Sequence, residues 1–477
     1  MILPMLYKDF YKTDHRRQYP TGTTLIYSNL TPRESRLKGV DKVVVFGIQY
    51  FLKDYLLRRF NEGFFKQPKD KVMTQYKRRM DNALGKDAFP LNHIADLHDL
   101  GYMPVHIKAL AEGSLCPLRV PFLTIKNTHK DFFWVTNFLE TIMSSVIWGG
   151  VNSATIAYQY KMILSEYAAK TSDIPEFVQW QGHDFSMRGM FGLEASLISG
   201  AAHLTSFTGT DTIPAIDFLE HFYGADSDKE LIGGSVPATE HSVMCMGGNE
   251  NELETYRRLL TEVYPNGIVS IVSDTWDYWH VFDNILPSLK NEIMARNGKL
   301  VIRPDSGDPV KVICGDGEAK GSIERLWDIF GGTVNSKGYK QLDSHIGLIY
   351  GDSITIERCK QICEQLEKRG FASTNVVLGI GSYTYQFNTR DTLGFAMKST
   401  YGEINGKGHQ IFKTPKTDSG VKNSAKGLLC VDEKMNLIEC ATEEQENLGM
   451  LRTVFLDGKL VNETTLSEVR ERLIIKA

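Results

Sequence analysis

From about residue 177 to residue 390 the chain repeats one sequence pattern: a short apolar run, then a turn rich in Gly, Asp, Ser or Arg, then a segment with helical periodicity. Strands that alternate with helices in this way form a parallel sheet or barrel. The apolar runs are FVQW, HLTSF, GIVSIV, KLVIR, HIGLIY and NVVLGI, and the clearest helix between two of them is TIERCKQICEQLEKRG. We therefore predict an α/β fold with a (β/α) barrel-like catalytic domain over residues 141–390.

Polar turns follow the apolar runs and predict where a site would lie. In chain order they are GHDFSMRG, TGTDT, SDTWD, RPDSGDP, GDS and GSY. The carboxyl ends of parallel barrel strands open on one rim, where barrel enzymes place their sites. Asp211 or Asp305 alone would more often cap a helix than bind a ligand. Six such turns in succession favour one shared site.

The N-terminal and C-terminal segments have sequence patterns that differ from this alternation. Residues 1–140 mix β-like runs such as TTLIYSNL and VDKVVVFGI with helical segments such as FLKDYLLRRFNEGFF. After residue 390 come hairpin-like segments, YGEINGKGHQIFKTPK and LLCVDEKMNLIE, and a charged helix, LSEVRERLI. We expect residues 1–140 and 391–477 to form one α+β domain that contributes to a dimer interface.

Charge and composition exclude some classes of partner. The 54 basic and 58 acidic residues leave a net charge of -4, so no global field attracts nucleic acid or an anionic membrane. No apolar stretch approaches the length of a membrane span. The seven cysteines are odd in number and scattered, which favours free thiols. We expect a cytoplasmic protein without nucleic-acid or membrane partners.

The side chains in the predicted rim suit a phosphorylated sugar. Arginine holds phosphate oxygens bidentately, while carboxylates accept from vicinal hydroxyls or hold Mg²⁺. GEINGKGH lacks the spacing of a P-loop, and GIGSYT lacks the last glycine of a dinucleotide fingerprint. The acidic pair before Thr-Gly-Gly that marks Rossmann-like phosphoribosyltransferases is also missing. His241 is the one imidazole in a polar turn, although a lone histidine is more often structural.

The ordered turns resemble those of the nicotinamide phosphoribosyltransferase family, a type II phosphoribosyltransferase family. The matching motifs are HDFSMRG, GTDT, SVPATEHS, VSDTWD, IRPDSGDP, YGDS and TRD, with DFYKTDHRRQYP, NSKGYKQL and IFKTP outside the barrel. The resemblance implies an enzyme of NAD salvage that forms nicotinamide mononucleotide and pyrophosphate from nicotinamide and phosphoribosyl pyrophosphate. It also implies Mg²⁺, coupled hydrolysis of ATP through a phosphohistidine, and a homodimer with shared active sites.

The resemblance assigns roles to particular residues. Phe185 and a partner's Tyr11 would sandwich the pyridine ring, and Asp211 would accept from the carboxamide NH₂. His241 would carry the phosphoryl group, and Mg²⁺ would be held mainly through pyrophosphate, its protein ligands unknown. The catalytic set is His241, Asp305 and Arg303. The substrate-binding set is Tyr11, Phe185, Arg188, Asp211, Ser235, Ser273, Asp277, Arg303, Asp305, Gly351, Asp352, Gly381, Ser382, Arg390, Lys398 and Lys413.

Within that set the expected contacts differ. Arg188, His241 and Arg303 would meet the pyrophosphate. Asp305, Gly351 and Asp352 would hold the ribose, and Arg390 the 5′-phosphate. The family's glycine-rich phosphate turn appears as Gly379, Gly381 and Ser382, with a serine where a glycine is usual; its hydroxyl could replace a backbone donor.

Two other functional hypotheses remain open at this point. A nicotinate phosphoribosyltransferase would share the barrel and the sugar substrate. A non-catalytic protein on the same scaffold is the other, because a fold alone does not prove activity. A comparison of product formation from the two bases separates all three.

Overall fold

The computed structural model describes residues 2–351, 354–413 and 424–475, and it divides the chain into two compact units. Unit 1 comprises Met1–Thr155, Leu219–Ala225 and Asn388–Leu473; unit 2 comprises Ile156–Phe218, Asp226–Phe387 and Ile474–Ala477. One boundary falls inside the long helix α6 (Glu140–Thr171), whereas the sequence placed it near residue 140. Another boundary falls between Phe387 and Asn388, and residues 219–225 and 474–477 are exchanged between the units as well.

Unit 1 is built on an antiparallel sheet of seven strands, in the order β15-β14-β1-β5-β3-β18-β19. The strands are β1 (Thr23–Pro32), β3 (Val105–Ala109), β5 (Leu123–Asn127), β14 (Phe395–Ile404), β15 (Lys407–Gln410), β18 (Arg452–Leu456) and β19 (Lys459–Leu460). β1 pairs with β14, and β3 with β18, so strands from the C-terminal segment belong to the same sheet as strands from the N-terminal segment. The β14–β15 hairpin turns at Asn405 and Gly406, both with positive φ.

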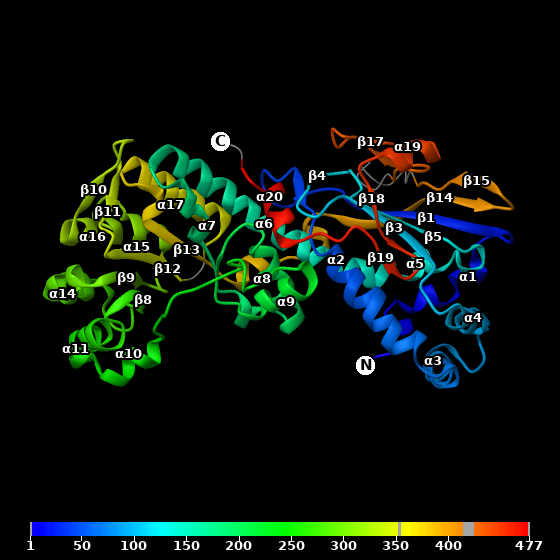
Figure 1. Ribbon diagram of the computed structural model, residues 1–477, viewed down its shortest axis with the longest axis horizontal. Coiled ribbons are helices and arrows are strands. Elements are labelled where there is room, and N and C mark those ends of the chain that lie inside the picture. Colours follow the sequence, from blue (N-terminus) through cyan, green and yellow to red (C-terminus); the bar gives the residue numbers. More distant parts are fainter. Residues whose placement is uncertain (1, 352–353, 414–423, 476–477) are drawn as a thin grey trace. The chain divides into compact units, whose positions relative to one another are not determined.

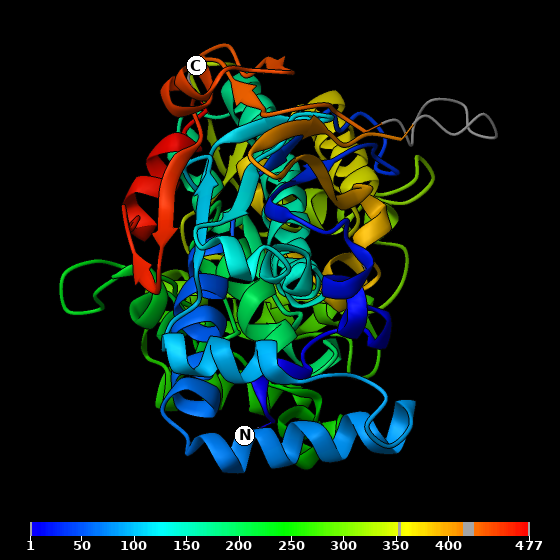
Figure 2. The same ribbon diagram turned by 90° about the vertical axis from the view of Figure 1, so that its right-hand side faces the viewer.

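Helices complete unit 1. α3 (Lys69–Leu84) and α4 (Asn92–Leu100) contact each other and lie side by side below the sheet in Figure 2. α3 carries the charged run KDKVMTQYKRRMD, and it buries one stripe, Val72, Tyr76 and Met80, at helical spacing. The others are α1 (His15–Gln18), α2 (Ile48–Tyr50), α5 (Val135–Phe138), α19 (Glu443–Leu448) and α20 (Leu466–Arg472).

A buried carboxylate anchors the helical segment that begins at Ile48. Glu112 Oε1 accepts the N–H of Gln49 at 2.6 Å, and Oε2 accepts the N–H of Gly47 and the hydroxyl of Tyr223, each at 2.8 Å. The first N–H groups of a helix have no partner within the helix, so the carboxylate satisfies donors that burial would otherwise leave unpaired.

We expect Glu112→Ala to lower the free energy of unfolding by about 2 kcal/mol, because it leaves buried donors without an acceptor. Urea unfolding followed by circular dichroism measures the loss. Glu62→Ala is the matched control, since Glu62 is exposed and only pairs with Arg58; it should change the value by about 0.5 kcal/mol or less. Equal losses in the two variants would contradict the anchoring role.

Unit 2 contains the parallel sheet predicted from the alternation of apolar runs and helical segments, with six strands in the order β7-β6-β13-β12-β9-β8. They are β6 (Gly182–Asp184), β7 (Gly209–Thr210), β8 (Asn266–Val272), β9 (Asn297–Arg303), β12 (Ile346–Tyr350) and β13 (Val376–Ile380), and every pairing is parallel. Residues 234–238 connect the two edges: Gly209 bridges to Gly234, and Ala238 to Ser270. The sheet is therefore curled, and the predicted barrel-like fold is confirmed.

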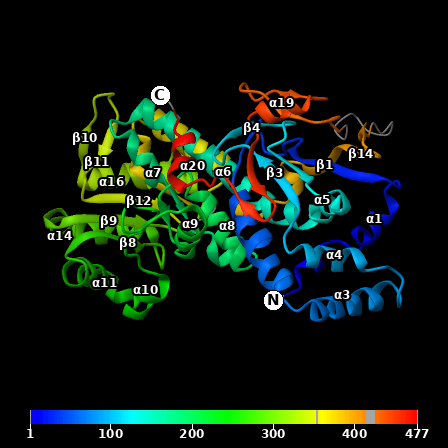
Figure 3. The same cartoon turned by 45° about the vertical axis from the view of Figure 1, so that its right-hand side comes forward.

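Helices surround this sheet. α15 (Pro309–Cys314), α16 (Ser322–Phe330) and α17 (Ile356–Lys368) lie together beside β9, β12 and β13, and α11 (Glu252–Arg258) and α14 (Lys290–Ala295) lie near β8 and β9 (Figures 1 and 3). α17 is the helix read most clearly from the sequence. The remaining helices are α7 (Val178–Gln181), α8 (Leu193–His203), α9 (Pro214–Tyr223), α10 (His241–Gly247), α12 (Tyr278–His280), α13 (Leu286–Ser288) and α18 (Ser382–Gln386).

Four of the six apolar runs are strands, and two predictions were wrong. GIVSIV, KLVIR, HIGLIY and NVVLGI form β8, β9, β12 and β13. FVQW is helical, because Pro175 starts a helical turn that continues into α7, and the strand β6 follows it. HLTSF is the end of α8 and a turn, and the short strand β7 follows at Gly209. The polar segments GHDFSMRG and TGTDT contain these two short strands.

Candidate active site

A cavity of about 350 Å³ lies inside the curled sheet of unit 2. Residues alternate along a strand between its two faces, and on β9 Lys299, Val301 and Arg303 face the cavity while Leu300 and Ile302 are buried behind them. The other lining side chains used below come from the segments before β6 and β13, from β8 and β12, and from residues 234–238.

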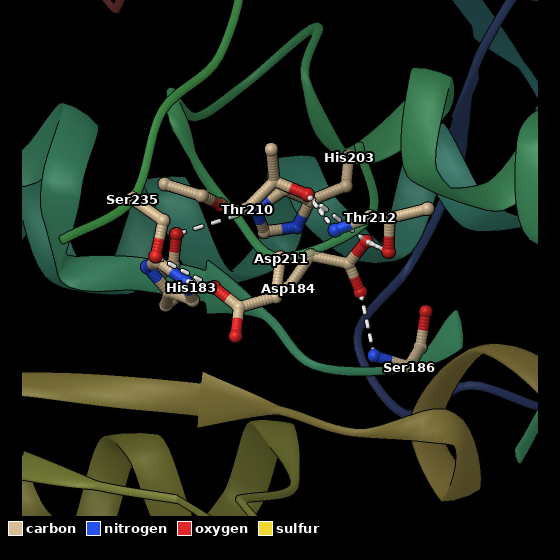
Figure 4. A network of polar contacts seen from close by, with 10 residues as sticks. His183, Asp184, Ser186, His203, Thr210, Asp211, Thr212 and Ser235 are labelled. Atoms are coloured by element: carbon tan, nitrogen blue, oxygen red, sulfur yellow. Dashed lines mark hydrogen bonds and ion pairs between the residues drawn. The ribbon is translucent and has the colours of Figure 1, made fainter. Parts of the chain in front are cut away.

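Asp211 lies at the carboxyl end of this cavity and follows β7. Its Oδ1 accepts hydrogen bonds from His183 Nε2 at 2.8 Å and from Ser235 Oγ at 2.6 Å. Figure 4 shows both donors on the Oδ1 side of the carboxylate, with Oδ2 directed away from them. Within the described residues no hydrogen bond is made by Oδ2. One oxygen is thus fixed, and the other can accept from a ligand.

The ionisation of Asp211 fits that role. Burial alone would raise the pKa of the carboxyl, but the hydrogen bonds from His183 and Ser235 outweigh burial, and Arg303 adds a favourable charge. The pKa is held below its ordinary value of 3.8. Asp211 is therefore a carboxylate at neutral pH, which attracts an N–H donor and repels an anion.

A second carboxylate holds the backbone around Asp211. Asp184, at the end of β6, is fully buried and accepts from the N–H of Ser186 at 2.9 Å and from the hydroxyl of Thr212 at 2.7 Å (Figure 4). Its carbonyl oxygen accepts the N–H of Asp211 at 2.9 Å. Asp184 thus fixes the turns after β6 and β7 against each other, which positions the functional carboxylate.

Phe185 lines the cavity beside Asp211, and two glycines give it and Asp305 room. A Cβ on Gly379 would lie 2.8 Å from Phe185 Cδ2 and 2.7 Å from the carbonyl oxygen of Tyr350. A Cβ on Gly351 would meet Asp305 Oδ1 at 2.0 Å. Gly379, which the resemblance assigns to the phosphate turn, and Gly351, which it assigns to the ribose, therefore also allow close packing.

Gly379→Ala is expected to raise KM for the base about tenfold, because the new methyl group displaces the ring of Phe185. Steady-state kinetics with the base varied measure this. Gly149→Ala, in α6, is the matched control, since a Cβ there meets nothing within 4 Å. Unchanged KM in Gly379→Ala would show that the position of Phe185 does not matter for the base.

Arg303 and Asp305 follow at the end of β9. The Nη2 of Arg303 donates to the carbonyl of Thr239 at 2.7 Å, and its Nε lies 3.5 Å from Asp305 Oδ1. The backbone N–H of Asp305 donates to Asp274 Oδ2 at 2.9 Å. A guanidinium and a carboxylate thus stand together at the rim, which matches the donor and acceptor pattern of a phosphorylated sugar.

His241 begins α10 and pairs with Asp274, which the sequence reasoning missed. His241 Nε2 lies 3.3 Å from Asp274 Oδ1, and Asp274 Oδ2 also accepts from Ser306 Oγ at 2.6 Å. The Asp274 side chain is 4% exposed and that of His241 is 47% exposed. Burial would raise the pKa of Asp274, but the bonds from Ser306, Asp305 and His241 keep it low. A buried carboxylate therefore orients an accessible imidazole.

Other predicted residues lie elsewhere. Arg188 is exposed in the turn after β6, and Ser382 begins α18, close to where a Cβ on Gly189 would lie. Asp277 caps α12 by accepting from the N–H groups of Trp279 and His280. Asp352 lies outside the described residues.

The structure does not place Ser273 on the cavity wall. It is fully buried, and its hydroxyl donates to the carbonyl of Ile271 and accepts from Tyr256. Ser273 follows β8, and the serine within β8 that lines the cavity is Ser270, whose buried Oγ has no hydrogen-bond partner in the described part of the chain. The alternation of β8 was the signal that could have found it.

The remaining predicted residues belong to unit 1. Tyr11 is 61% exposed, and Arg390 is exposed beside Asp391. Lys398, on β14, has a pKa lowered first by burial and then by the charges of Lys413, Arg33 and Lys12, while Glu140 opposes the shift. The four cations outnumber the one nearby carboxylate, that of Glu140, so this cluster of basic side chains is suited to binding an anion. Arg33 and Lys12 were not among the predicted residues.

Taken together, the curled parallel sheet, the fixed carboxylate beside an aromatic ring and the guanidinium–carboxylate pair at the carboxyl ends of the strands have the arrangement of a barrel enzyme's active site. Residues 180–459 match the model of the nicotinate phosphoribosyltransferase (NAPRTase) family, and residues 4–107 match the N-terminal domain of nicotinamide phosphoribosyltransferase. The chain belongs to the nicotinate phosphoribosyltransferase family and is a pentosyltransferase.

Individual relatives agree with this. The chain is 53% identical over 493 residues to nicotinamide phosphoribosyltransferase of Acinetobacter baylyi, covering 99% of this chain and 97% of the relative. It is 37% identical to the Mycoplasma pneumoniae protein of the same name, covering 86% and 92%. Two solved structures share the fold: nicotinate-nucleotide pyrophosphorylase from Pyrococcus furiosus (TM-score 0.60, 12% identity, 98% and 94% covered) and human nicotinic acid phosphoribosyltransferase (0.53, 15%, 98% and 92%).

Proposed function

We propose that this enzyme joins nicotinamide to the ribose of phosphoribosyl pyrophosphate, forming nicotinamide mononucleotide and pyrophosphate in NAD salvage. The observation that carries the choice of base is the carboxylate of Asp211. Its Oδ1 is held by His183 and Ser235, while Oδ2 is directed away from both. Oδ2 can accept from the carboxamide NH₂ of nicotinamide, whereas the carboxylate of nicotinate would meet a like charge. The 53% identity with a nicotinamide enzyme supports the same choice.

The reaction needs positioning and charge more than covalent chemistry. Departure of pyrophosphate leaves an oxocarbenium-like ribose, and the pyridine nitrogen must face the anomeric carbon. Phe185 would stack on the ring while Asp211 fixes its rotation, which aims that nitrogen. Arg303, with Arg188, would bind the leaving pyrophosphate and stabilise its developing charge, and Asp305 would accept from ribose hydroxyls.

Mg²⁺ fits this site as an ion held by the substrate. Within residues 2–351, 354–413 and 424–475 no group of three or more His, Cys, Asp or Glu side chains could hold a metal ion. Mg²⁺ is commonly bound by one or two carboxylates together with substrate phosphates, and Asp305 is a carboxylate at the rim. When bound, the ion would screen the charge of the pyrophosphate.

We also propose that ATP phosphorylates His241 and that this step is coupled to product formation. The γ-phosphoryl group would pass to an imidazole nitrogen, with ADP as the leaving group, and water would later release phosphate. The buried Asp274 holds Nε2, which leaves Nδ1 as the nucleophile. The accessible imidazole and the anchored carboxylate support this proposal.

A homodimer with shared sites is the proposed assembly, in which Tyr11 of a second copy completes the stack on the ring. Exposed apolar side chains support it. Phe191 and Phe387 are 89% and 75% exposed, and the N–H of Phe191 donates to Gln386 Oε1 at 2.6 Å, so the two lie in one region of unit 2. Tyr383 stacks on Phe387 with ring centroids 5.0 Å apart. Exposed aromatic patches of this kind mark protein interfaces.

Location in the cytoplasm remains part of the proposal. All seven cysteines are free thiols, as expected for a reducing compartment. Among the helices that the structure describes, none has the length and apolar character needed to cross a bilayer.

The test is product formation from each base with phosphoribosyl pyrophosphate and Mg²⁺, with and without ATP. Nicotinamide should be used far better than nicotinate. Equal or better use of nicotinate would support the nicotinate phosphoribosyltransferase reading instead. Absence of nicotinamide mononucleotide with fresh substrates, ATP and Mg²⁺ would support a non-catalytic protein on this scaffold.

A further inference from the structure

The cavity inside the curled sheet has two chemically different ends. Parallel strands place their first residues at one end and their last residues at the other. Arg303 is the last residue of β9 and Lys299 lies four residues earlier on the same face, a separation of roughly 13 Å along the strand. Asp211 lies at the carboxyl end with Arg303. The proposed base site occupies only that end.

Lys299 provides an uncompensated cation at the amino end. Among the described residues its ammonium group forms no hydrogen bond and no ion pair. Burial lowers the pKa of Lys299, and Asp343 partly opposes the shift. Asp343 is not part of the cavity wall, and His345 already donates to its carboxylate at 2.7 Å through Nδ1 and 2.9 Å through the backbone.

The position of Lys299 in the cavity is built into the sheet. Its aliphatic stem crosses Gly347 on β12, where a Cβ would lie 3.3 Å from Lys299 Cδ and 3.6 Å from Val301 Cγ2. A larger residue at position 347 would crowd the lysine. The absence of a side chain there lets the ammonium extend along the cavity wall.

The walls around Lys299 are mainly apolar and aromatic. Phe177 and Trp180 precede β6, and Ile268, Leu342 and Ile346 line the same end. An anion with an apolar body suits this environment. A dianion such as phosphate would leave one charge without a partner among apolar side chains, which is costly.

The polar groups at this end are already engaged with one another. Gln341 Nε2 donates to Asn375 Oδ1 at 2.8 Å, and Thr374 Oγ1 donates to Gln341 Oε1 at 3.1 Å. Asn375 Nδ2 donates to the carbonyl of Lys340 at 2.8 Å. They do not compete for the ammonium, so Lys299 is the group left to select a ligand.

We propose that the amino end of the cavity is a second binding site, for an aromatic monocarboxylate whose carboxylate pairs with Lys299 and whose ring packs against Phe177 and Trp180. The cavity would then sort its ligands by charge: Asp211 favours a neutral amide at one end, and Lys299 favours an acid at the other. A pyridine or benzene carboxylate can therefore occupy the protein without reacting. This inference goes beyond the proposed function and does not depend on turnover.

Benzoate is the probe, because it has no pyridine nitrogen and cannot become a nucleotide, and benzamide is its neutral match. Isothermal titration of the full chain with benzoate should show one site, weakened at least tenfold in Lys299→Met and restored to within about threefold in Lys299→Arg. Lys290→Met, an exposed lysine on α14, is the control and should bind as the wild type does. Benzamide binding should be unchanged in Lys299→Met.

Several results would overturn the proposal. These are no benzoate binding to the wild type, equal binding to Lys299→Met, or displacement of benzoate by inorganic phosphate at comparable concentration, which would indicate a general anion site. Thermal unfolding checks that Lys299→Met is folded. If Lys299→Met is not folded, Lys299→Arg still tests the proposal, because it keeps a positive charge at this position. The nicotinamide KM of a folded Lys299→Met should stay within about twofold, so failure of this inference and failure of the proposed reaction give different results.

Discussion

Replacing Asp211 with asparagine should lower kcat/KM for nicotinamide by about 100-fold, or about 2.7 kcal/mol, while the use of nicotinate falls much less or rises. Asparagine keeps an oxygen for His183 and Ser235 but places an NH₂ where Oδ2 stood. A donor would then face the carboxamide NH₂ of the substrate. The same NH₂ could donate to the carboxylate of nicotinate, so the ratio of the two bases should shift toward the acid.

The measurement is kcat/KM for each base with phosphoribosyl pyrophosphate and Mg²⁺, at pH 7. At that pH the lowered pKa of Asp211 keeps the wild-type carboxylate ionised. The stabilisation that this carboxylate gives the folded state is fully present above its ordinary pKa of 3.8, and it is lost only as the pH falls through the lower pKa of the folded state. Asp217→Asn, an exposed position on α9, is the control. Equal losses for both bases in Asp211→Asn would show that Asp211 only holds His183 in place.

Sequence pattern predicted the strands of unit 2 where the hydrophobic signal is long. β8, β9, β12 and β13 each have five residues or more, and their apolar runs are continuous. β6 and β7 have three and two residues, too few to produce a pattern, and the neighbouring helical residues FVQW and HLTSF carry more apolar character. The polar turns located those short strands better than hydrophobicity did, because the residues that form the turns, Asp184 and Asp211 among them, can be recognised in the sequence itself.

The site shows the same division between what local pattern can and cannot reveal. Asp211 was found through its motif, but His183 and Asp274, which fix Asp211 and His241, contact them across 28 and 33 residues of sequence. Such pairs exist only once the strands are adjacent. Asp277 shows a different ambiguity, since a polar residue after a strand can cap the next helix, as Asp277 caps α12.

Lys299 was missed for a related reason. A lysine near the start of a strand reads as a solvated strand end, and only the curled sheet turns that position toward a cavity. Period-two alternation places Lys299 on the same face as Arg303, yet it does not say which face is concave. The direction of curl comes from pairing between strands, which a single run of sequence does not contain.

His241→Ala should abolish stimulation by ATP while transfer without ATP stays within about threefold of wild type, because the imidazole is proposed to carry phosphate and not to bind nicotinamide. With γ-labelled ATP, the wild type should acquire an acid-labile, base-stable label, and the variant none.

Asp274→Asn tests the positioning role: the rate of labelling should fall about 10- to 100-fold with ATP affinity unchanged, since the amide can no longer stabilise a positively charged imidazole. A fall in ATP affinity alone would mean that Asp274 shapes the site without acting through His241. Labelling that persists in His241→Ala would refute the phosphohistidine, and loss of transfer without ATP in the same variant would show that the reaction itself needs the contact between His241 and pyrophosphate that the resemblance implies.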